Sequence, residues 1–180
     1  AATLVILVLG LAPSETAREI VRKPWVAGRF VYANQIIGRD VPALEVKSEL
    51  PVLSKNGFLA SHPFIPENLR KPESKWERLE AGRLISIAAC SSCHSLTDTG
   101  IRPIAKYFPA EADAAGINDW LSAGLYRGHI VYMPPLPLPE LDRSVMSEFL
   151  AEIISVQKTD PQRAANYAVK GFPKDSVGGK

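Results

Sequence analysis

The sequence predicts a mainly α-helical fold, and three stretches of the chain carry this prediction. Apolar residues recur at helical spacing over about residues 74–89, 117–127 and 139–156, whereas no convincing strand pattern appears between residues 76 and 157. The chain has 180 residues, 46% of them hydrophobic and 22% charged, so it can pack a core in one ordinary domain with extensions, or in two very small domains. The net charge of only +2 argues against a dedicated nucleic-acid binder, which needs a concentrated basic patch.

The first expected helix, over about 74–89, has a recognisable start. Ser74 is a suitable N-cap residue, and Glu77 three positions later completes a capping box, in which each side chain accepts the backbone N–H of the other residue. The apolar positions on one face are Leu84, Ile87 and Ala88. This helix leads directly into the two cysteines of the chain.

The second and third expected helices lie in the last third of the chain. The apolar positions over 117–127 are Ile117, Trp120, Leu121 and Leu125. The apolar stripe over 139–156 consists of Leu141, Val145, Phe149 and Ile153. Pro139 is tolerated at the start of the third helix because its missing N–H would have no partner there. Met146 lies beside this stripe, and we expect it to fill the core.

The two cysteines form the pattern C-x-x-C-H, with Cys90 and Cys93 followed at once by His94. This pattern is typical of covalent haem attachment. Two thiols three positions apart lie on neighbouring points of one helical turn, where both can add to the vinyl groups on one edge of a porphyrin. The next residue then presents its imidazole to the iron. The motif therefore predicts one covalently attached haem c with His94 as an axial ligand.

Two other kinds of site use paired cysteines. A structural zinc site needs two further Cys or His ligands at matching spacing, but His62 and His129 form no second paired cluster. A thioredoxin-like redox pair belongs in a βαβ setting, which this sequence does not indicate. Haem attachment is therefore the favoured interpretation, and we expect His62 to be a structural or surface residue.

Met133 is the candidate for the second axial position of the haem iron. It lies 39 residues after His94, and the prolines that follow it stiffen an extended loop that can hold a thioether against iron. Ligation by Met and His raises the haem potential. His129 is the rival sixth ligand. The same segment contains three further candidate pocket residues, of which Trp120 and Tyr132 would pack in the pocket or contact a propionate and Arg127 would pair with a propionate or lie exposed.

Residues 76–157 resemble the class I cytochromes c. Gly82 precedes Cys90 by eight residues, Gly100 and Pro103 follow the haem motif, and the Met-Pro-Pro loop leads into a last helix. The resemblance implies that Gly82 lets the last helix cross closely, and that the carbonyl of Pro103 accepts the Nδ1 proton of His94, a bond that orients the ligand. Ser86 stands where the family has an aromatic residue, which puts the usual helix-crossing contact in doubt.

The first twelve residues form an apolar run without charge. A membrane-spanning helix needs about 20 apolar residues, so the run is too short by itself. It could be the apolar region of a signal peptide, a buried core helix, or the last turns of a transmembrane helix. We favour the third interpretation, with residues 1–25 as a helix end and interfacial segment, because charged residues follow at Arg18, Arg22 and Lys23.

The segment Glu19–Trp25 is similar to a Glu-x-x-Arg-Gln-Pro-Trp segment in the quinol-oxidising subunit of cytochrome bd-type oxidases. In that family the segment ends a transmembrane helix near a b-type haem. The similarity implies that Arg22 offsets the charge of a haem propionate. The alternative is a belt of Arg, Lys and Trp that anchors a helix end at the interface.

Two further regions complete the predicted organisation. Residues 26–75 read as an irregular connector, interrupted by closely spaced prolines, in which 26–37 could form an amphipathic helix. The pairs Phe58-Leu59 and Phe64-Ile65 predict that the connector packs on another part of the protein. Residues 158–180 lack periodicity and read as a tail that wraps a partner or stays mobile.

The sequence thus predicts a class I cytochrome c-like haem domain with a transmembrane helix end and a connector. The implied function is a membrane-attached c-type cytochrome that passes single electrons between a quinol-linked membrane respiratory complex and a partner redox protein. The haem domain would lie on the periplasmic side, where the family receives its haem, and it would be an electron-transfer subunit rather than a stand-alone enzyme. One alternative is a haem enzyme or gas sensor with an open sixth position, and another is a binding module with an inert dithiol.

Overall fold

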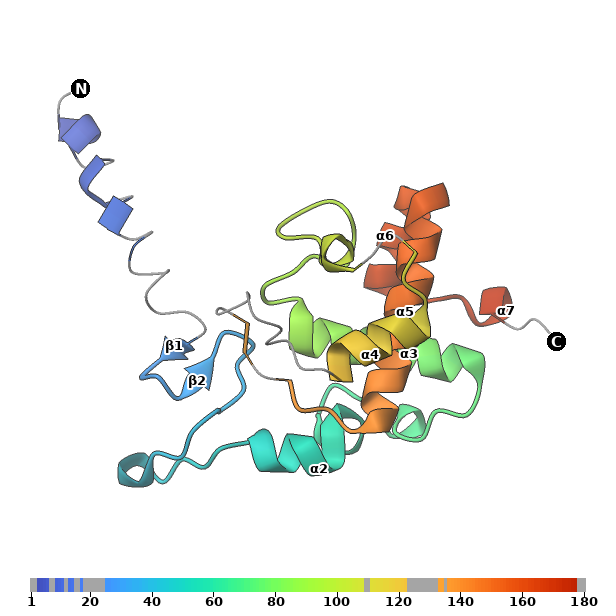
Figure 1. Cartoon of the computed structure of the whole chain (residues 1–180), viewed down its shortest axis with the longest axis horizontal. Coiled ribbons are helices and arrows are strands. Elements are labelled where there is room, and N and C mark those ends of the chain that lie inside the picture. The colour runs from blue at the N-terminus through green and yellow to red at the C-terminus, as the bar shows by residue number, and fades with distance from the viewer. Residues whose placement is uncertain are drawn as a thin grey trace.

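The computed structural model describes residues 3–6, 9–11, 13–14, 17, 25–108, 111–122, 133–134 and 136–177. Helices account for 61% of the described residues and strands for 5%, which confirms the mainly α fold class. Figure 1 shows a helical body, beside which β1, β2 and α2 lie, and an N-terminal stretch that projects away from it.

Three helices form the body: α3 (Lys75–Cys90), α4 (Ala114–Ser122) and α5 (Glu140–Thr159). The capping box at the start of α3 is confirmed, because the Glu77 N–H donates to Ser74 Oγ at 3.2 Å and the Ser74 N–H donates to Glu77 Oε2 at 2.9 Å. The described part of the second expected helix is α4, which begins three residues earlier than predicted, and residues 123–127 lie outside the described residues.

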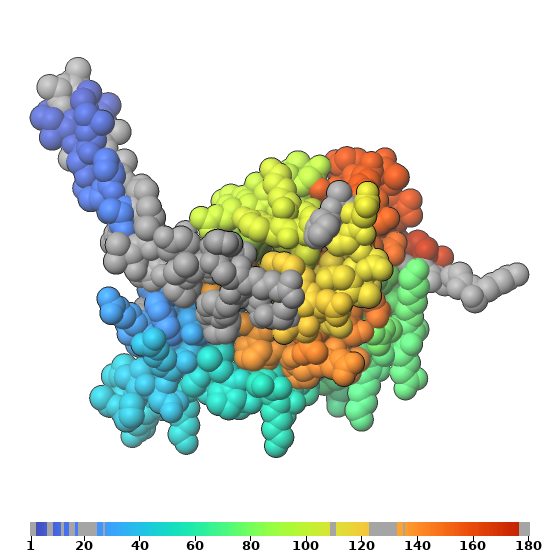
Figure 2. Space-filling view, viewed as in Figure 1, coloured from blue at the N-terminus to red at the C-terminus, as the bar shows by residue number. Residues whose placement is uncertain are grey.

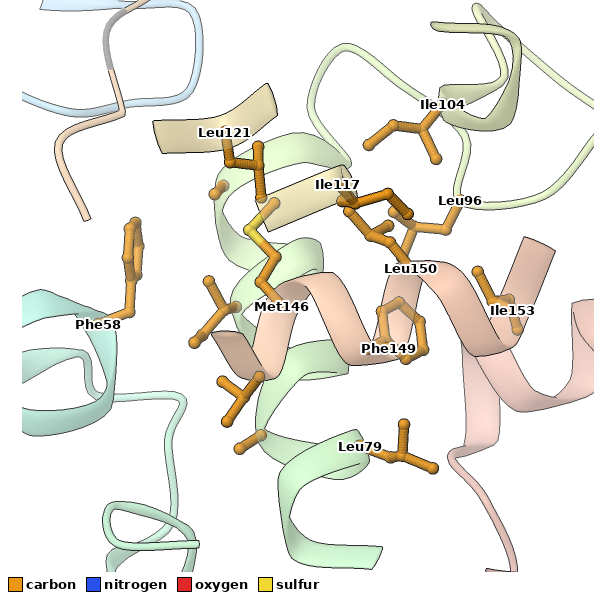
Figure 3. Close-up of a cluster of buried hydrophobic side chains, with 14 of the residues drawn as sticks. Phe58, Leu79, Leu96, Ile104, Ile117, Leu121, Met146, Phe149, Leu150 and Ile153 are labelled. Carbon is orange, nitrogen blue, oxygen red and sulfur yellow. The ribbon is translucent and has the colours of Figure 1, made fainter. Parts of the chain in front are cut away.

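The core lies where α5 packs against both α3 and α4. Figure 3 shows Ile117 and Leu121 of α4 meeting Met146 and Leu150 of α5. All four side chains are buried, and Met146 is only 1% exposed, so its expected place in the core is confirmed. The core fixes the end of α3, which carries the cysteine motif.

Helices α3 and α5 cross in close contact at Gly82. A Cβ atom at this position would contact the carbonyl oxygen of Val145 and lie 2.8 Å from the Cβ of Phe149. The expected role of Gly82 as a close crossing point is therefore confirmed. Ser86, one turn further along α3, is fully buried, so the crossing is retained although the aromatic residue is missing.

The predicted amphipathic helix over 26–37 is wrong. Residues Trp25–Ala27 (β1) and Val31–Tyr32 (β2) instead form an antiparallel hairpin. Gly28 and Arg29 have φ values of 46° and 57°, in the left-handed region, and two such residues in succession reverse the chain and end any helix. Aromatic stacking stabilises the hairpin, since the rings of Trp25 and Tyr32 lie 4.1 Å apart and the guanidinium of Arg39 lies 4.7 Å from the centre of the Trp25 ring.

The connector also contains a helix that the proline spacing did not predict, α2 (Leu50–Ser61). Pro51 lies in its first turn, where a missing N–H costs nothing, and Gly57 interrupts it with φ 69° and ψ −172°. Shorter 3-10 turns lie at Pro42–Leu44 (η1), Glu67–Leu69 (η2) and Ile104–Tyr107 (η3). Phe58, Leu59 and Ile65 are buried, as the expected packing of the connector requires, whereas Phe64 is 71% exposed.

A buried carboxylate joins the connector to the helical body. Asp142, in the first turn of α5, is 2% exposed, and its Oδ2 accepts the backbone N–H groups of Phe58 at 2.5 Å and Leu59 at 3.2 Å. Gly57 lies against this carboxylate so closely that a Cβ atom at this position would displace it. Burial raises the pKa of Asp142, and the two N–H donors oppose this shift.

We expect Asp142→Ala to lower the free energy of unfolding by roughly 2–4 kcal/mol, because two buried N–H groups lose their acceptor at about 1–3 kcal/mol each. Denaturant unfolding followed by circular dichroism measures this loss. Asp142→Asn keeps an oxygen acceptor for the two N–H groups, so it should lose less stability than Asp142→Ala.

The difference in unfolding free energy between the wild type and Asp142→Asn should also depend on pH, and the raised pKa gives its sign. Because the folded pKa of Asp142 lies above its ordinary value of 3.8, the folded state binds more protons between those two values. The wild type should therefore gain stability relative to Asp142→Asn as the pH falls through that window. A difference that does not change with pH would contradict this assignment.

The C-terminal residues pack on the body as helices α6 (Pro161–Lys170) and α7 (Lys174–Val177), so the predicted mobile or partner-wrapping tail is wrong for this stretch. Asp160 caps α6 by accepting the N–H of Arg163 at 2.9 Å. Phe172 is buried, and its carbonyl accepts the indole N–H of Trp76 at 2.7 Å. The tail thereby holds the start of α3.

The described residues among 3–17 are helical, and Figures 1 and 2 show their projection from the body. Their exposed apolar side chains are Leu4, Val5, Ile6, Leu9 and Leu11. Among the described residues, no helix combines the length and apolar character needed to cross a bilayer. Arg22 and the rest of residues 18–24 lie outside the described residues.

Candidate functional site

One cavity of about 200 Å³ brings together the four residues predicted to hold a haem and its iron: Cys90, Cys93, His94 and Met133. The first three come from the end of α3 and the turn after it, and Met133 comes from the segment before α5. The other lining residues are Ala33, Asn34, Ala89, Arg102, Ile104, Tyr107, Phe108, Trp120, Leu121, Pro134, Leu136 and Met146. Most of these side chains are apolar, so the cavity suits a hydrophobic group.

The end of α3 places the two thiols on one wall of the cavity. Cys90 is the last residue of α3, and its carbonyl accepts the N–H groups of Cys93 at 3.0 Å and His94 at 2.9 Å. The motif is thus one hydrogen-bonded turn that continues from the helix. Both cysteines are free thiols.

The imidazole of His94 is buried and held from one side. Its Nδ1 lies 2.9 Å from the carbonyl oxygen of Arg102. A carbonyl only accepts, so Nδ1 carries the proton and Nε2 keeps its lone pair in the neutral ring. The Tyr107 ring lies nearly perpendicular to the imidazole at a centroid distance of 5.1 Å. A ring held by Nδ1 with a free Nε2 is the arrangement that metal-bound histidines use.

The predicted acceptor of this bond, the carbonyl of Pro103, is wrong by one residue. The carbonyl of Pro103 instead accepts the N–H of Lys106 at 3.1 Å and so begins the turn η3. Arg102 has a φ of 47°, in the left-handed region, and its carbonyl is the one bonded to His94. Pro103 is buried beside this bond, and it does not itself line the cavity.

The thiol of Cys90 is held in its neutral form. Burial, with a smaller effect from neighbouring Cys93, raises the pKa of Cys90 to about 12. A thiol of this kind disfavours nucleophilic catalysis, which needs the anion. Among the described residues, no group of three or more His, Cys, Asp or Glu side chains is placed to hold a metal ion.

The opposite walls come from α4 and the segment that precedes α5. The rings of Trp120 and Phe108 meet edge to face at 5.0 Å, which confirms the expected packing of Trp120 in the pocket. Met146 closes the cavity from the core side. Arg127, His129 and Tyr132, which were expected to contribute a propionate contact, a rival ligand and packing, lie outside the described residues, as does Pro135.

The sequence did not predict that the connector would contribute to this site. Ala33 and Asn34, from the turn after β2, line the cavity together with Met133 and Leu136. No periodicity or motif marks these two residues, because their place depends on the tertiary packing of the connector. His62, by contrast, packs between the rings of Phe58 and Phe64 at 5.1 and 5.3 Å, as a structural histidine does.

Comparisons with protein-family models, with curated proteins and with solved structures found no match for this chain. The chemistry of the site must therefore be judged from its own residues. Two thiols on one wall, an imidazole with a free Nε2 and a thioether share one apolar cavity, and this donor set fits a covalently attached haem.

Proposed function

We propose that this chain is a membrane-attached monohaem c-type cytochrome that transfers single electrons. The observation that carries the proposal is the convergence of Cys90, Cys93, His94 and Met133 on one apolar cavity, although Met133 lies 39 residues from His94. The arrangement was expected from the C-x-x-C-H motif and the Met-Pro-Pro loop, and the cavity supplies the common space that such a site requires.

Each of these residues has a distinct role in the proposed site. Cys90 and Cys93 would hold the haem through their sulfur atoms, and His94 would bind its iron through Nε2 while the carbonyl of Arg102 fixes the imidazole ring. Met133 would be the second protein ligand of the iron. The haem, when bound, supplies one-electron exchange at its iron. The apolar walls exclude water and favour the less charged, reduced form.

The wider assignment rests on the resemblance to class I cytochromes c and on the N-terminal segment. The close crossing at Gly82 and the helix α5 after the Met-Pro-Pro loop support the resemblance. The exposed apolar side chains of residues 3–11 support attachment to a bilayer. In this proposal the haem domain lies on the periplasmic side and serves a quinol-linked respiratory complex and a partner redox protein, with Arg22 near a b-type haem of that complex.

The proposal is tested by producing the full chain in a host with haem-attachment machinery. We expect a low-spin spectrum with the far-red band that reports iron–methionine ligation in the oxidised state. Met133→Ala should lose this band, open the sixth position and lower the reduction potential, because a thioether ligand favours ferrous iron.

Met146→Leu is the matched control, because it removes the other methionine of the same cavity. This variant should keep the far-red band. A five-coordinate, high-spin spectrum of the wild type would instead support a haem enzyme or gas sensor with an open sixth position. Loss of the band in Met146→Leu alone would overturn the assignment of Met133.

A further inference from the structure

We propose that a second cavity, between the connector and the end of α3, binds an organic anion with an aromatic body. The cavity has a volume of about 840 Å³, which is within the range of small-molecule sites in proteins. The end of α3 divides it from the haem cavity, because Ile87 lines the second cavity and Cys90 lines the first. Among the described residues the two cavities share only Asn34, so the second cavity is a separate site that does not depend on haem.

The inner part of the second cavity is apolar and partly aromatic. Ile36, Leu53 and Phe58 line it, and each is at most 8% exposed. The ring of His62 lies next to Phe58 at a centroid distance of 5.1 Å, and the ring of Phe64 lies 5.3 Å from that of His62. Three neighbouring rings therefore contribute to one wall, which suits an aromatic ligand.

Two large apolar side chains of this cavity are exposed to water. Phe64 is 71% exposed and Val52 is 50% exposed, although both line the same cavity as the buried residues. An exposed apolar patch of this kind is typical of a ligand-binding groove. A bound aromatic group would cover the Phe64 ring, and binding would gain free energy from the apolar surface that it removes from water.

Two hydrogen-bond donors of the second cavity lack a partner in the described part of the chain. The backbone N–H of Phe64 donates to Nδ1 of His62 at 3.3 Å, so the neutral imidazole carries its proton on Nε2. Burial lowers the pKa of His62, which Glu49 partly offsets, so the ring stays neutral near neutral pH. Neither Nε2 of His62 nor the ammonium of Lys47 forms a hydrogen bond or an ion pair with a described residue.

The charges that line the cavity favour an anionic ligand. The carboxylate of Glu49 is held by the connector, because its Oε2 accepts the N–H of Ile37 at 2.7 Å. Lys47 has no such partner, so its charge is available to a carboxylate of the ligand. His62 offers an N–H donor to a second acceptor oxygen. An aromatic carboxylate combines the ring that the apolar wall suits with the charge that Lys47 suits.

Titration calorimetry of the full chain with naphthoate, an aromatic carboxylate, tests this inference. We expect saturable binding, and weaker binding of naphthylmethanol, which has the same rings without the charge. Lys47→Met should weaken the binding of naphthoate roughly two- to fivefold, as the loss of an exposed ion pair does, and leave that of naphthylmethanol unchanged. Phe64→Ser should weaken the binding of both probes roughly tenfold, because their rings lose an apolar contact.

Lys55→Met and Ile101→Ser are the matched controls, because both residues are exposed and neither lines the cavity. Both controls should keep the wild-type affinity. Wild-type affinity in both Lys47→Met and Phe64→Ser would place the probe elsewhere and overturn the inference, and an equal loss in the controls would do the same. So would the absence of saturable binding at a naphthoate concentration on the order of 1 mM. None of these results bears on covalent haem attachment, which is measured separately, so the proposed function would stand.

Discussion

Gly82→Ala is expected to lower the free energy of unfolding by about 3 kcal/mol or more, the largest stability effect that we foresee for a single methyl group. The added Cβ would contact the carbonyl oxygen of Val145 and lie 2.7 Å from its carbonyl carbon. Both atoms belong to the backbone of α5, so no side-chain rotation can relieve the overlap. The two helices must separate, and the core between them opens.

The sign of this stability change tests the crossing, because the same substitution has the opposite effect in an exposed helix. In a solvent-exposed helix, glycine to alanine stabilises a protein by roughly 0.5–1 kcal/mol. Gly116, which is exposed in α4, provides the matched control, and Gly116→Ala should be neutral or slightly stabilising. Thermal and denaturant unfolding of the two variants measure the difference. Equal stabilities would show that α3 and α5 do not cross at Gly82.

The double variant Cys90→Ala/Cys93→Ala is expected to abolish covalent haem attachment, because both thioether bonds then have no sulfur. Each single variant keeps one thiol and should retain part of the covalently bound haem. Haem that survives acid–acetone extraction, or that remains with the chain on a denaturing gel, measures the covalent fraction.

Ser91→Ala is the matched control for this experiment. Ser91 is exposed, lies between the two cysteines and does not line the cavity, and its hydroxyl donates to the carbonyl of Ile87 and not to a thiol, so its loss should leave the covalent fraction unchanged. Haem that remains covalently bound in the double variant would contradict the attachment sites. The absence of covalent haem in the wild type would instead favour a binding module with an inert dithiol.

The features that could be predicted from the sequence are those fixed by residues close together in the chain. The capping box at Ser74 and Glu77 and the turn from Cys90 to His94 need only local hydrogen bonds, and the structure has them where they were expected. The crossing at Gly82 could be predicted because it follows from a resemblance, not from periodicity.

The features that could not be predicted depend on the tertiary packing of short, irregular segments. The imidazole of His94 bonds to the carbonyl of Arg102 and not to the expected carbonyl of Pro103, because the turn η3 uses the Pro103 carbonyl. The place of Asn34 in the cavity depends on the hairpin of β1 and β2 and on the attachment of α2 to Asp142. Neither leaves a pattern in the sequence, because each is set by contacts between distant parts of the chain.

Helices α3 and α5 cross in space but lie far apart along the chain, and this order affects how the site forms. The turn from Cys90 to His94 lies before α5 in the chain, and the crossing of α5 with α3 completes the core. Closing the long loop between α3 and α5 costs entropy, so this crossing forms later than the local turn. Until α5 packs on α3, the two thiols lie in a chain that is still open. In the proposed function, haem would be attached in this interval, once the chain has reached the periplasmic side.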